Sequence, residues 1–159
     1  MNTGAIKEHT IPDITEHNIK LTNIKDLKPH EQINPKRLLE VKKSIIIEGL
    51  KYPIVADKKT NIILDGHHRF NAFKKLNIKN IPVYYVNYLD DKIILDTWSR
   101  QKITKEDVIN KVESGGLFPE KTTRHMLATQ DGPTHISEAL PKIDLDITRL
   151  TKNRYEPFQ

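Results

Sequence analysis

An Asp-Gly pair at positions 65 and 66 separates a β-type segment from a helical one, and this junction limits the folds open to the chain. The segment before it, 61–64, is short and mostly apolar, as in a buried strand. After it, apolar residues recur at three-residue steps and predict a helix ending near Asn77. These residues are Phe70, Phe73 and Leu76. A strand that leads directly into a helix requires a fold that packs both kinds of element together.

Further segments repeat this mixture. Asn34 and Pro35 are suited to begin a helix that Gly49 ends. Its predicted apolar stripe is Leu38, Val41 and Ile45, broadened by Leu39 and Ile46. Strands are predicted within 19–27, 52–57, 61–64, 83–88 and 93–98, and another helix between Thr104 and Gly115. The interleaved elements indicate one α+β domain with helices and strands in packed layers.

With 159 residues the chain is expected to form a single domain. We expect 1–18 to be an N-terminal arm and 128–159 to be mostly loop, with one strand from Ile143 to Ile147. The chain has no cysteine, which excludes disulfides, thiolate metal sites and thiol nucleophiles. Neither a membrane span nor a secretory leader is apparent, so the expected location is cytoplasmic. The oligomeric state is left open.

The junction at 65–69 is also the strongest functional signal. Backbone N–H groups at the start of a helix and the helix dipole together make an anion site. Gly66 allows a phosphate to approach the backbone, and His67, His68 and Arg69 supply donors or cations within one turn. An ordinary turn followed by a surface helix is the plainer alternative. We favour a phosphate site, with Asp65 beside it.

A second cluster of donors lies at 121–125 and comprises Lys121, Thr122, Thr123, Arg124 and His125. Hydroxyls, cations and an imidazole in five residues indicate a phosphate clamp, although a solvated basic loop has the same composition. Two phosphate sites suit phosphoryl transfer, which also needs a group to accept the proton of the acceptor hydroxyl. Glu31 and Asp65 are the candidate carboxylates: one could be the base and the other could hold Mg²⁺.

These residues resemble the ParB/sulfiredoxin-like superfamily, in which a Pro-x-Glu loop precedes one helix and Gly-x-x-Arg opens another. The matching segments here are Pro29-His30-Glu31 and Gly66-His67-His68-Arg69. The resemblance implies a small mixed sheet with interleaved helices. Within the superfamily the chain is most similar to the free L-serine kinases, through 65–69, Thr97-Trp98-Ser99-Arg100 and 118–125.

That resemblance implies transfer of the terminal phosphoryl group of ADP or ATP to the hydroxyl of free L-serine, with Mg²⁺. Glu31 would be the catalytic base and Asp65 would lie near the metal. Segments 66–69 and 122–125 would hold nucleotide phosphates. The serine pocket would comprise Trp98, Ser99 and Arg100. His68 would either donate to a phosphate or pair with Asp65. Serine kinases continue further beyond the clamp than this chain does.

Two rival functions use the same fold. A ParB-type partition or transcription module needs a DNA-reading helix pair, and the sequence after 127 predicts none, so no nucleic-acid partner is expected. The net charge of +5 is equally compatible with a phosphorylated ligand. A nucleotide sensor without catalysis remains open. Sulfiredoxin chemistry is excluded because it requires a cysteine.

Overall fold

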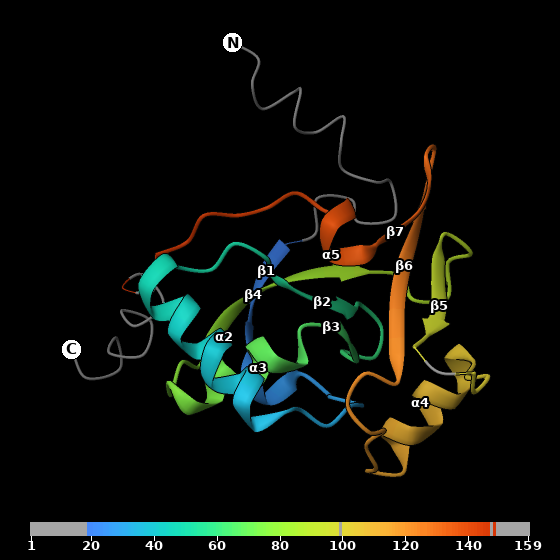
Figure 1. The fold of residues 1–159 in the computed structure, drawn as a ribbon, viewed down its shortest axis with the longest axis horizontal. Helices are drawn as coiled ribbons and strands as arrows, with labels where there is room; N and C mark the ends of the chain where they lie inside the picture. The colour runs from blue at the N-terminus through green and yellow to red at the C-terminus, as the bar shows by residue number, and fades with distance from the viewer. Residues whose placement is uncertain (1–18, 99, 147, 149–159) are drawn as a thin grey trace.

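The structure is a computed structural model that describes residues 19–98, 100–146 and 148. Its first sheet has the strand order β1-β4-β2-β3 (Figure 1). The strands are β1 (Ile19–Asn23), β4 (Asn80–Val86), β2 (Ile54–Asp57) and β3 (Ile63–Asp65). β2 runs parallel to β4 and the other two pairs are antiparallel, so this is the small mixed sheet expected. The predicted arm lies outside the described residues.

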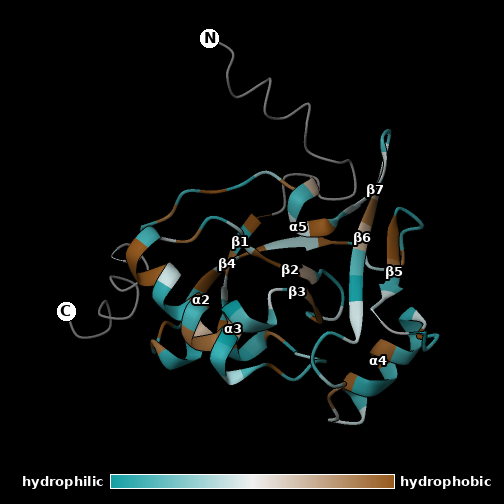
Figure 2. Ribbon diagram, in the orientation of Figure 1, coloured by the Kyte–Doolittle hydropathy of each residue, from teal (hydrophilic) through white to brown (hydrophobic). Residues whose placement is uncertain are grey.

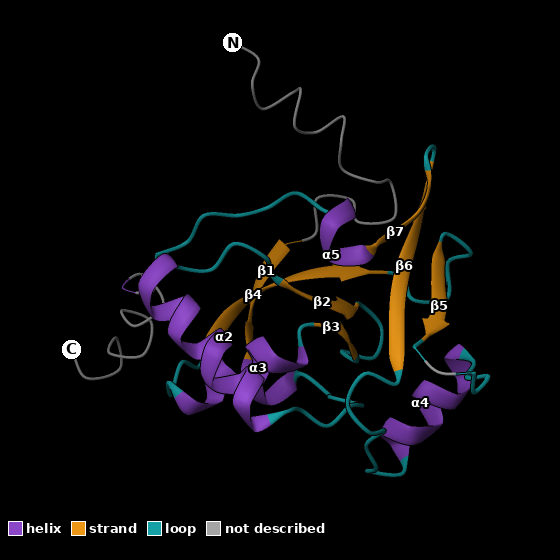
Figure 3. Cartoon of the chain, in the orientation of Figure 1, coloured by secondary structure: helices purple, strands orange, loops and turns teal. Residues whose placement is uncertain are grey.

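A second, antiparallel sheet has the order β5-β6-β7. Its strands are β5 (Ile93–Thr97), β6 (Thr123–Thr129) and β7 (Gly132–His135). The helices of the described chain are α2 (Pro35–Glu48), α3 (His67–Lys75), α4 (Lys105–Glu113) and the short α5 (Ile136–Ala139), with a 3₁₀ turn η1 (Ile24–Asp26) after β1. Helices α2 and α3 lie side by side, whereas α4 lies near the second sheet (Figures 1 and 3). The predicted α+β class is confirmed.

The helix boundaries follow from local chemistry. Asn34 caps α2 by accepting hydrogen bonds from the N–H groups of Lys36 and Arg37, while Pro35 occupies the first turn. Gly49 ends that helix in the left-handed region with φ of 81°. Thr104 and Asp107 form a capping box at the start of α4. The predicted starts of these two helices are therefore correct.

Two apolar clusters make up the core. One joins α2 and α3 to the first sheet through residues such as Leu38, Phe73 and Ile81. The other lies between the sheets and includes Tyr88 and Leu127. In Figure 2, α2 and α3 carry both hydrophobic and hydrophilic residues, as expected for helices with one buried face. The site described below lies where these two packing units meet.

Three predictions about elements differ from the structure. Leu39 and Ile46 do not broaden the buried stripe of α2, because their side chains are 60% and 46% exposed. The segment after 127 is less loop-like than predicted, since β6 continues to Thr129 and is followed by β7 and α5. The predicted strand at 143–147 is reduced to one bridge between Leu145 and Leu50, and Ile147 lies outside the described residues. Within the described part of the chain, no helix combines the length and apolar character that crossing a membrane requires.

Candidate active site

A cavity of about 490 Å³ opens between α2, the β3–α3 junction and the start of β6. Most of the residues predicted from the sequence line it: Glu31, Asp65, Gly66, His67, His68, Arg69, Trp98, Lys121, Thr123, Arg124 and His125. Thr122 and Arg100 are not among its lining residues, and Ser99 lies outside the described residues. The fold thus brings the two predicted phosphate segments and Glu31 to one hollow.

The N-terminus of α3 borders this cavity without a side-chain cap. Gly66 is its N-cap residue, with φ of 106°, and has no side chain to accept from the first-turn N–H groups. A Cβ at this position would lie 3.0 Å from the side chain of Ile54 and 3.1 Å from the Arg69 guanidinium. Only glycine combines this conformation with that space. The open N–H groups and the helix dipole make this end a suitable anion site.

Arg69 is tied to the protein itself. Its guanidinium donates to the backbone carbonyls of Tyr52 and Pro53, and its Nη2 lies 2.7 Å from Asp65 Oδ2. These bonds fasten α3 to the segment before β2. Much of the donor capacity of Arg69 is therefore used structurally, and its predicted contact with phosphate stays a prediction.

The two histidines of α3 are neutral in this geometry. His68 Nε2 accepts from the Asn34 N–H at 3.0 Å, so that nitrogen carries no proton despite lying 3.7 Å from Glu120. His67 Nε2 likewise accepts from the His30 N–H at 3.1 Å. Burial is the main cause that lowers the pKa of each imidazole, strongly so for His67. Through Nε2 these two histidines link α3 to the backbone of the loop before α2, and their predicted contact with phosphate stays a prediction.

Hydrogen bonds from residues at the start of β6 hold the Glu31 side chain in place. Its Oε2 accepts from the Thr123 N–H at 2.8 Å and from the Thr123 hydroxyl at 2.5 Å, and Oε1 accepts from the Lys121 N–H at 3.1 Å. Burial raises the pKa of the Glu31 carboxyl, while these hydrogen bonds act in the opposite direction. Lys121 has φ of 60°, so a left-handed residue turns the chain here. A carboxylate is thus fixed beside the cavity.

The remaining members of the predicted clamp differ in their surroundings. Arg124 pairs with Asp96 and stacks on Trp98, with its guanidinium 4.6 Å from the ring centroid. His125 is 2% exposed and its Nε2 lies 2.9 Å from the Tyr88 hydroxyl, so burial lowers its pKa well below the ordinary value. The Thr122 hydroxyl donates to the Pro119 carbonyl. Arg124, like Lys121, combines a positive charge with a place on the cavity wall.

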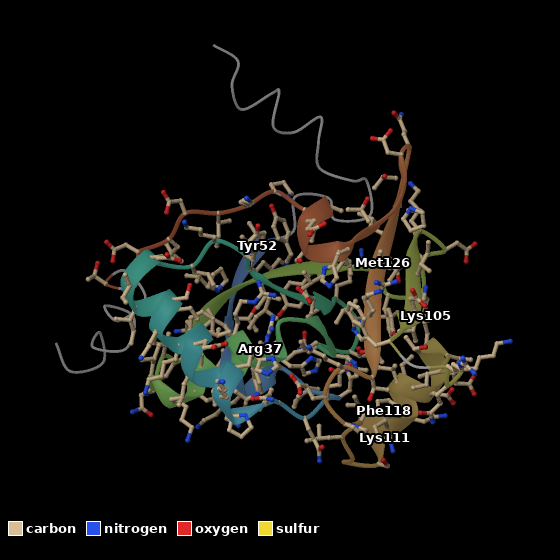
Figure 4. The ribbon with its side chains drawn as sticks, in the orientation of Figure 1. Arg37, Tyr52, Lys105, Lys111, Phe118 and Met126 are labelled. Atoms are coloured by element: carbon tan, nitrogen blue, oxygen red, sulfur yellow. The ribbon has the colours of Figure 1, made fainter. Side chains whose placement is uncertain are left out.

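Trp98 is 58% exposed at the cavity edge, which suits a surface that a ligand covers. The structure also adds cavity residues that the sequence analysis missed, among them Arg37, Glu120 and His135 (Arg37 is labelled in Figure 4). His135 Nε2 lies 3.8 Å from Asp65 Oδ1. It was missed because its segment was expected to be loop. Arg37 could have been found, since it lies in the first turn after the Asn34 cap.

Asp65 is the described carboxylate that fits a role in holding a cation beside the phosphate site. Its Oδ2 is bound to Arg69, and Oδ1 faces His135 without a hydrogen bond. Among the described residues no group of three or more histidines or carboxylates is arranged to hold a metal ion. Mg²⁺, however, needs only one or two carboxylates when phosphate oxygens complete its shell. The residues present fit Mg²⁺ only in that shared form.

The chain resembles known proteins in both sequence and fold. The family model of the ParB N-terminal domain matches residues 5–97. The chain is 36% identical over 83 residues to the ATP-dependent L-serine kinase of Staphylothermus marinus, covering 49% of this chain and 33% of that protein. It is 30% identical over 97 residues to the ADP-dependent L-serine kinase of Thermococcus kodakarensis, covering 57% and 40%. The chain therefore spans only a third to two-fifths of the length of these two relatives.

Among solved structures, a free serine kinase variant in complex with ADP superposes with a TM-score of 0.72. The match covers 84% of this chain and 94% of that one, at 18% sequence identity. At this identity the likeness concerns the fold. It confirms the fold that the sequence motifs predicted.

Proposed function

This chain belongs to the ParB N-terminal domain family, and from that premise we propose that it is a kinase that phosphorylates free L-serine with ADP or ATP. The observation that carries the proposal is the placement of the Glu31 carboxylate in the same cavity as the uncapped N-terminus of α3. One group is suited to accept a hydroxyl proton and the other to bind a phosphate. L-serine is proposed as the acceptor because the relatives are named L-serine kinases.

In the proposed reaction, Glu31 accepts the proton of the serine hydroxyl while that oxygen forms a bond to the terminal phosphorus of the nucleotide. The bond from this phosphorus to the bridging oxygen breaks, and the nucleotide leaves with one phosphate fewer. The products are O-phospho-L-serine and AMP from ADP, or ADP from ATP. Backbone N–H groups of α3 and the guanidinium of Arg124 would stabilise charge on the phosphoryl oxygens.

Mg²⁺ would be held by Asp65 Oδ1 and by phosphate oxygens of the bound nucleotide, and it would neutralise part of their charge. The Arg69 guanidinium keeps the other oxygen of Asp65 occupied and so fixes the direction of the first. Trp98 at the cavity edge and the neighbouring Arg100 are proposed to contact serine, as the resemblance implies. Gly66 and Arg69, with Lys121 and Arg124, are proposed for the nucleotide phosphates.

Product analysis tests this function directly. The purified protein is mixed with L-serine, Mg²⁺ and either ADP or ATP, and the products are separated and identified. O-Phosphoserine with AMP from ADP, or with ADP from ATP, is the expected result, and it identifies the donor. Nucleotide binding without O-phosphoserine from either donor would instead favour a sensor or partition-type module. Threonine and homoserine in parallel reactions test the acceptor.

A further inference from the structure

We propose that Thr123 and His30 are positioning residues that fix the Glu31 carboxylate so that Oε1, and not Oε2, receives the proton of the acceptor hydroxyl. The proposal rests on the proposed function, because it assumes that Glu31 is the base. It assigns Thr123 a role different from the phosphate contact expected from its place in the sequence. It also gives a role to a buried histidine that the sequence analysis did not single out.

The two oxygens of Glu31 differ in the number of donors they receive. A carboxylate oxygen has about two lone-pair directions. Both directions of Oε2 are occupied, by the N–H and by the hydroxyl of Thr123. Oε1 receives one donor among the described residues, the Lys121 N–H. Oε1 is thus the oxygen with room for a further hydrogen, and Glu31 lines the cavity.

The direction of the Thr123 hydroxyl determines which nitrogen of His30 carries the proton. An ionised Glu31 can only accept, so Thr123 must donate its hydroxyl hydrogen to Oε2. The oxygen of Thr123 then accepts from His30, whose Nε2 lies 3.0 Å away. His30 is therefore the Nε2–H tautomer, and its Nδ1 is a bare nitrogen. Nδ1 is buried and has no hydrogen-bond partner among the described residues, so this tautomer leaves it as an unpaired acceptor.

The surroundings of His30 keep it neutral. Its side chain is fully buried, and the rings of His67 and His125 lie 4.5 Å and 5.7 Å from its ring, centroid to centroid. Burial lowers the pKa of His30 to about 4, and the nearby Ile63 carbonyl offsets this only in part. His30 is therefore not a sink for the transferred proton, which stays on Glu31 until product leaves. Its contribution is the Nε2–H donor, which orients the hydroxyl of Thr123.

The alternative tautomer would break the hydrogen bond between the Thr123 hydroxyl and Glu31. If Nδ1 carried the proton, it would face the Ile63 carbonyl and Nε2 would accept the hydroxyl hydrogen of Thr123. Glu31 would then lose the donor whose hydrogen bond most strongly opposes the effect of burial on its pKa. Besides this hydroxyl, the backbone N–H groups of Thr123 and Lys121 lower the pKa of Glu31, and the Glu120 carboxylate raises it. The pKa of Glu31 therefore depends on whether the Thr123 hydroxyl donates its hydrogen to it.

Thr123→Val and Thr123→Ser test the proposal as a matched pair, because valine retains the shape and serine retains the hydroxyl. We expect Thr123→Val to lower kcat by about tenfold to a hundredfold, the scale of a small misplacement of a catalytic group, with KM for the nucleotide nearly unchanged. The acidic limb of the kcat profile should move to higher pH, because the ionised base has lost a donor. Thr123→Ser should restore both. A raised nucleotide KM with an unmoved pH profile would overturn the proposal in favour of a phosphate contact.

A measurement without turnover separates this proposal from the proposed function. ¹⁵N NMR of labelled histidine reports the tautomer of His30, and carboxyl ¹³C NMR reports the titration of Glu31. We expect the Nε2–H tautomer, and a pKa of Glu31 that is higher in Thr123→Val than in the wild type or Thr123→Ser. If the tautomer is Nδ1–H, or if the Glu31 titration is the same in all three proteins, the positioning role is wrong. If these spectra are as expected and no phosphoserine forms, only the proposed function fails.

Discussion

At the scale of single residues, burial decides which groups of the cavity are charged. Three histidines that the sequence places in or beside phosphate-binding motifs, His67, His68 and His125, have lowered pKa values because the fold removes them from water. The permanent charge on the wall comes instead from arginine and lysine side chains. Sequence motifs identify the residues of such a site, whereas their protonation depends on packing.

Glu31→Gln is expected to lower turnover by about a hundredfold to ten-thousandfold, the range that a general base contributes. Glutamine keeps one acceptor oxygen for Thr123 but cannot take up a proton. Nucleotide affinity, measured by calorimetry, should be nearly unchanged, since no phosphate contact is removed. Turnover close to that of the wild type would remove Glu31 from the mechanism.

The buried histidines should make the protein sensitive to acid. The pKa of His30 is lowered from 6.5 to about 4, so between these values the unfolded chain binds a proton that the native state does not. The free energy of unfolding therefore keeps its full value above pH 6.5 and decreases as the pH falls towards 4. For His30 alone the loss is about 3 kcal/mol.

Urea unfolding at pH 7.5 and pH 4.5 measures this loss. In His30→Gln, which retains a side-chain N–H donor, the difference between the two pH values should be smaller than in the wild type. An equal difference in both proteins would show that His30 titrates normally in the native state.

At the scale of elements, the ends of helices and the strand β5 were predicted well, whereas β6 and β7 of the second sheet were not. Asn34 and Gly49 mark the two ends of α2, and their capping preferences are visible in the sequence. In β6, by contrast, the alternating buried positions are Thr123, His125 and Leu127, two of which are polar. The pattern therefore resembles a basic loop. Glu31 and Thr123 lie 92 positions apart, and their bond depends on the tertiary fold.

Gly49→Ala should destabilise the protein more than Gly115→Ala. Both glycines have positive φ, 81° and 78°, so alanine is strained at either position, by about 1–3 kcal/mol. Gly49 also has ψ of −178°, in a region essentially restricted to glycine. A Cβ at position 49 would also lie 2.6 Å from the Leu145 carbonyl oxygen, whereas at position 115 it meets nothing within 4 Å. That oxygen accepts from the Leu50 N–H, so the bridge that holds the C-terminal segment to the end of α2 would be lost.

Urea unfolding of the two variants makes the comparison, and the difference between them reports the steric contact with Leu145 together with the backbone strain particular to position 49. We expect Gly49→Ala to be less stable by at least about 1 kcal/mol, the scale of one hydrogen bond. Equal losses would mean that the Leu145 segment does not pack against α2 in solution.

At the scale of the whole molecule, the cavity joins the two packing units of the fold. Its walls come from α2 and α3, which cover the first sheet, and from β6, which belongs to the second. A nucleotide held by both the α3 N-terminus and Arg124 would bind only when both units are folded. Binding to the native state alone stabilises a protein by about 2.7 kcal/mol at a ligand concentration of 100 Kd.

For a chain of this size that free energy corresponds to a rise in Tm of roughly 5–10 °C. We expect ADP to produce this rise in a single transition, monitored by circular dichroism and by Trp98 fluorescence, since the described chain carries this tryptophan beside Arg124. Arg124→Ala, compared at the same ADP concentration, should show a smaller rise because its affinity is lower. If ADP raised the Tm measured by circular dichroism but not the Tm measured by Trp98 fluorescence, the nucleotide would contact only the unit formed by the first sheet with α2 and α3. Arg124 would then have no part in holding phosphate, and the second sheet would serve Glu31 through Thr123 without touching the donor.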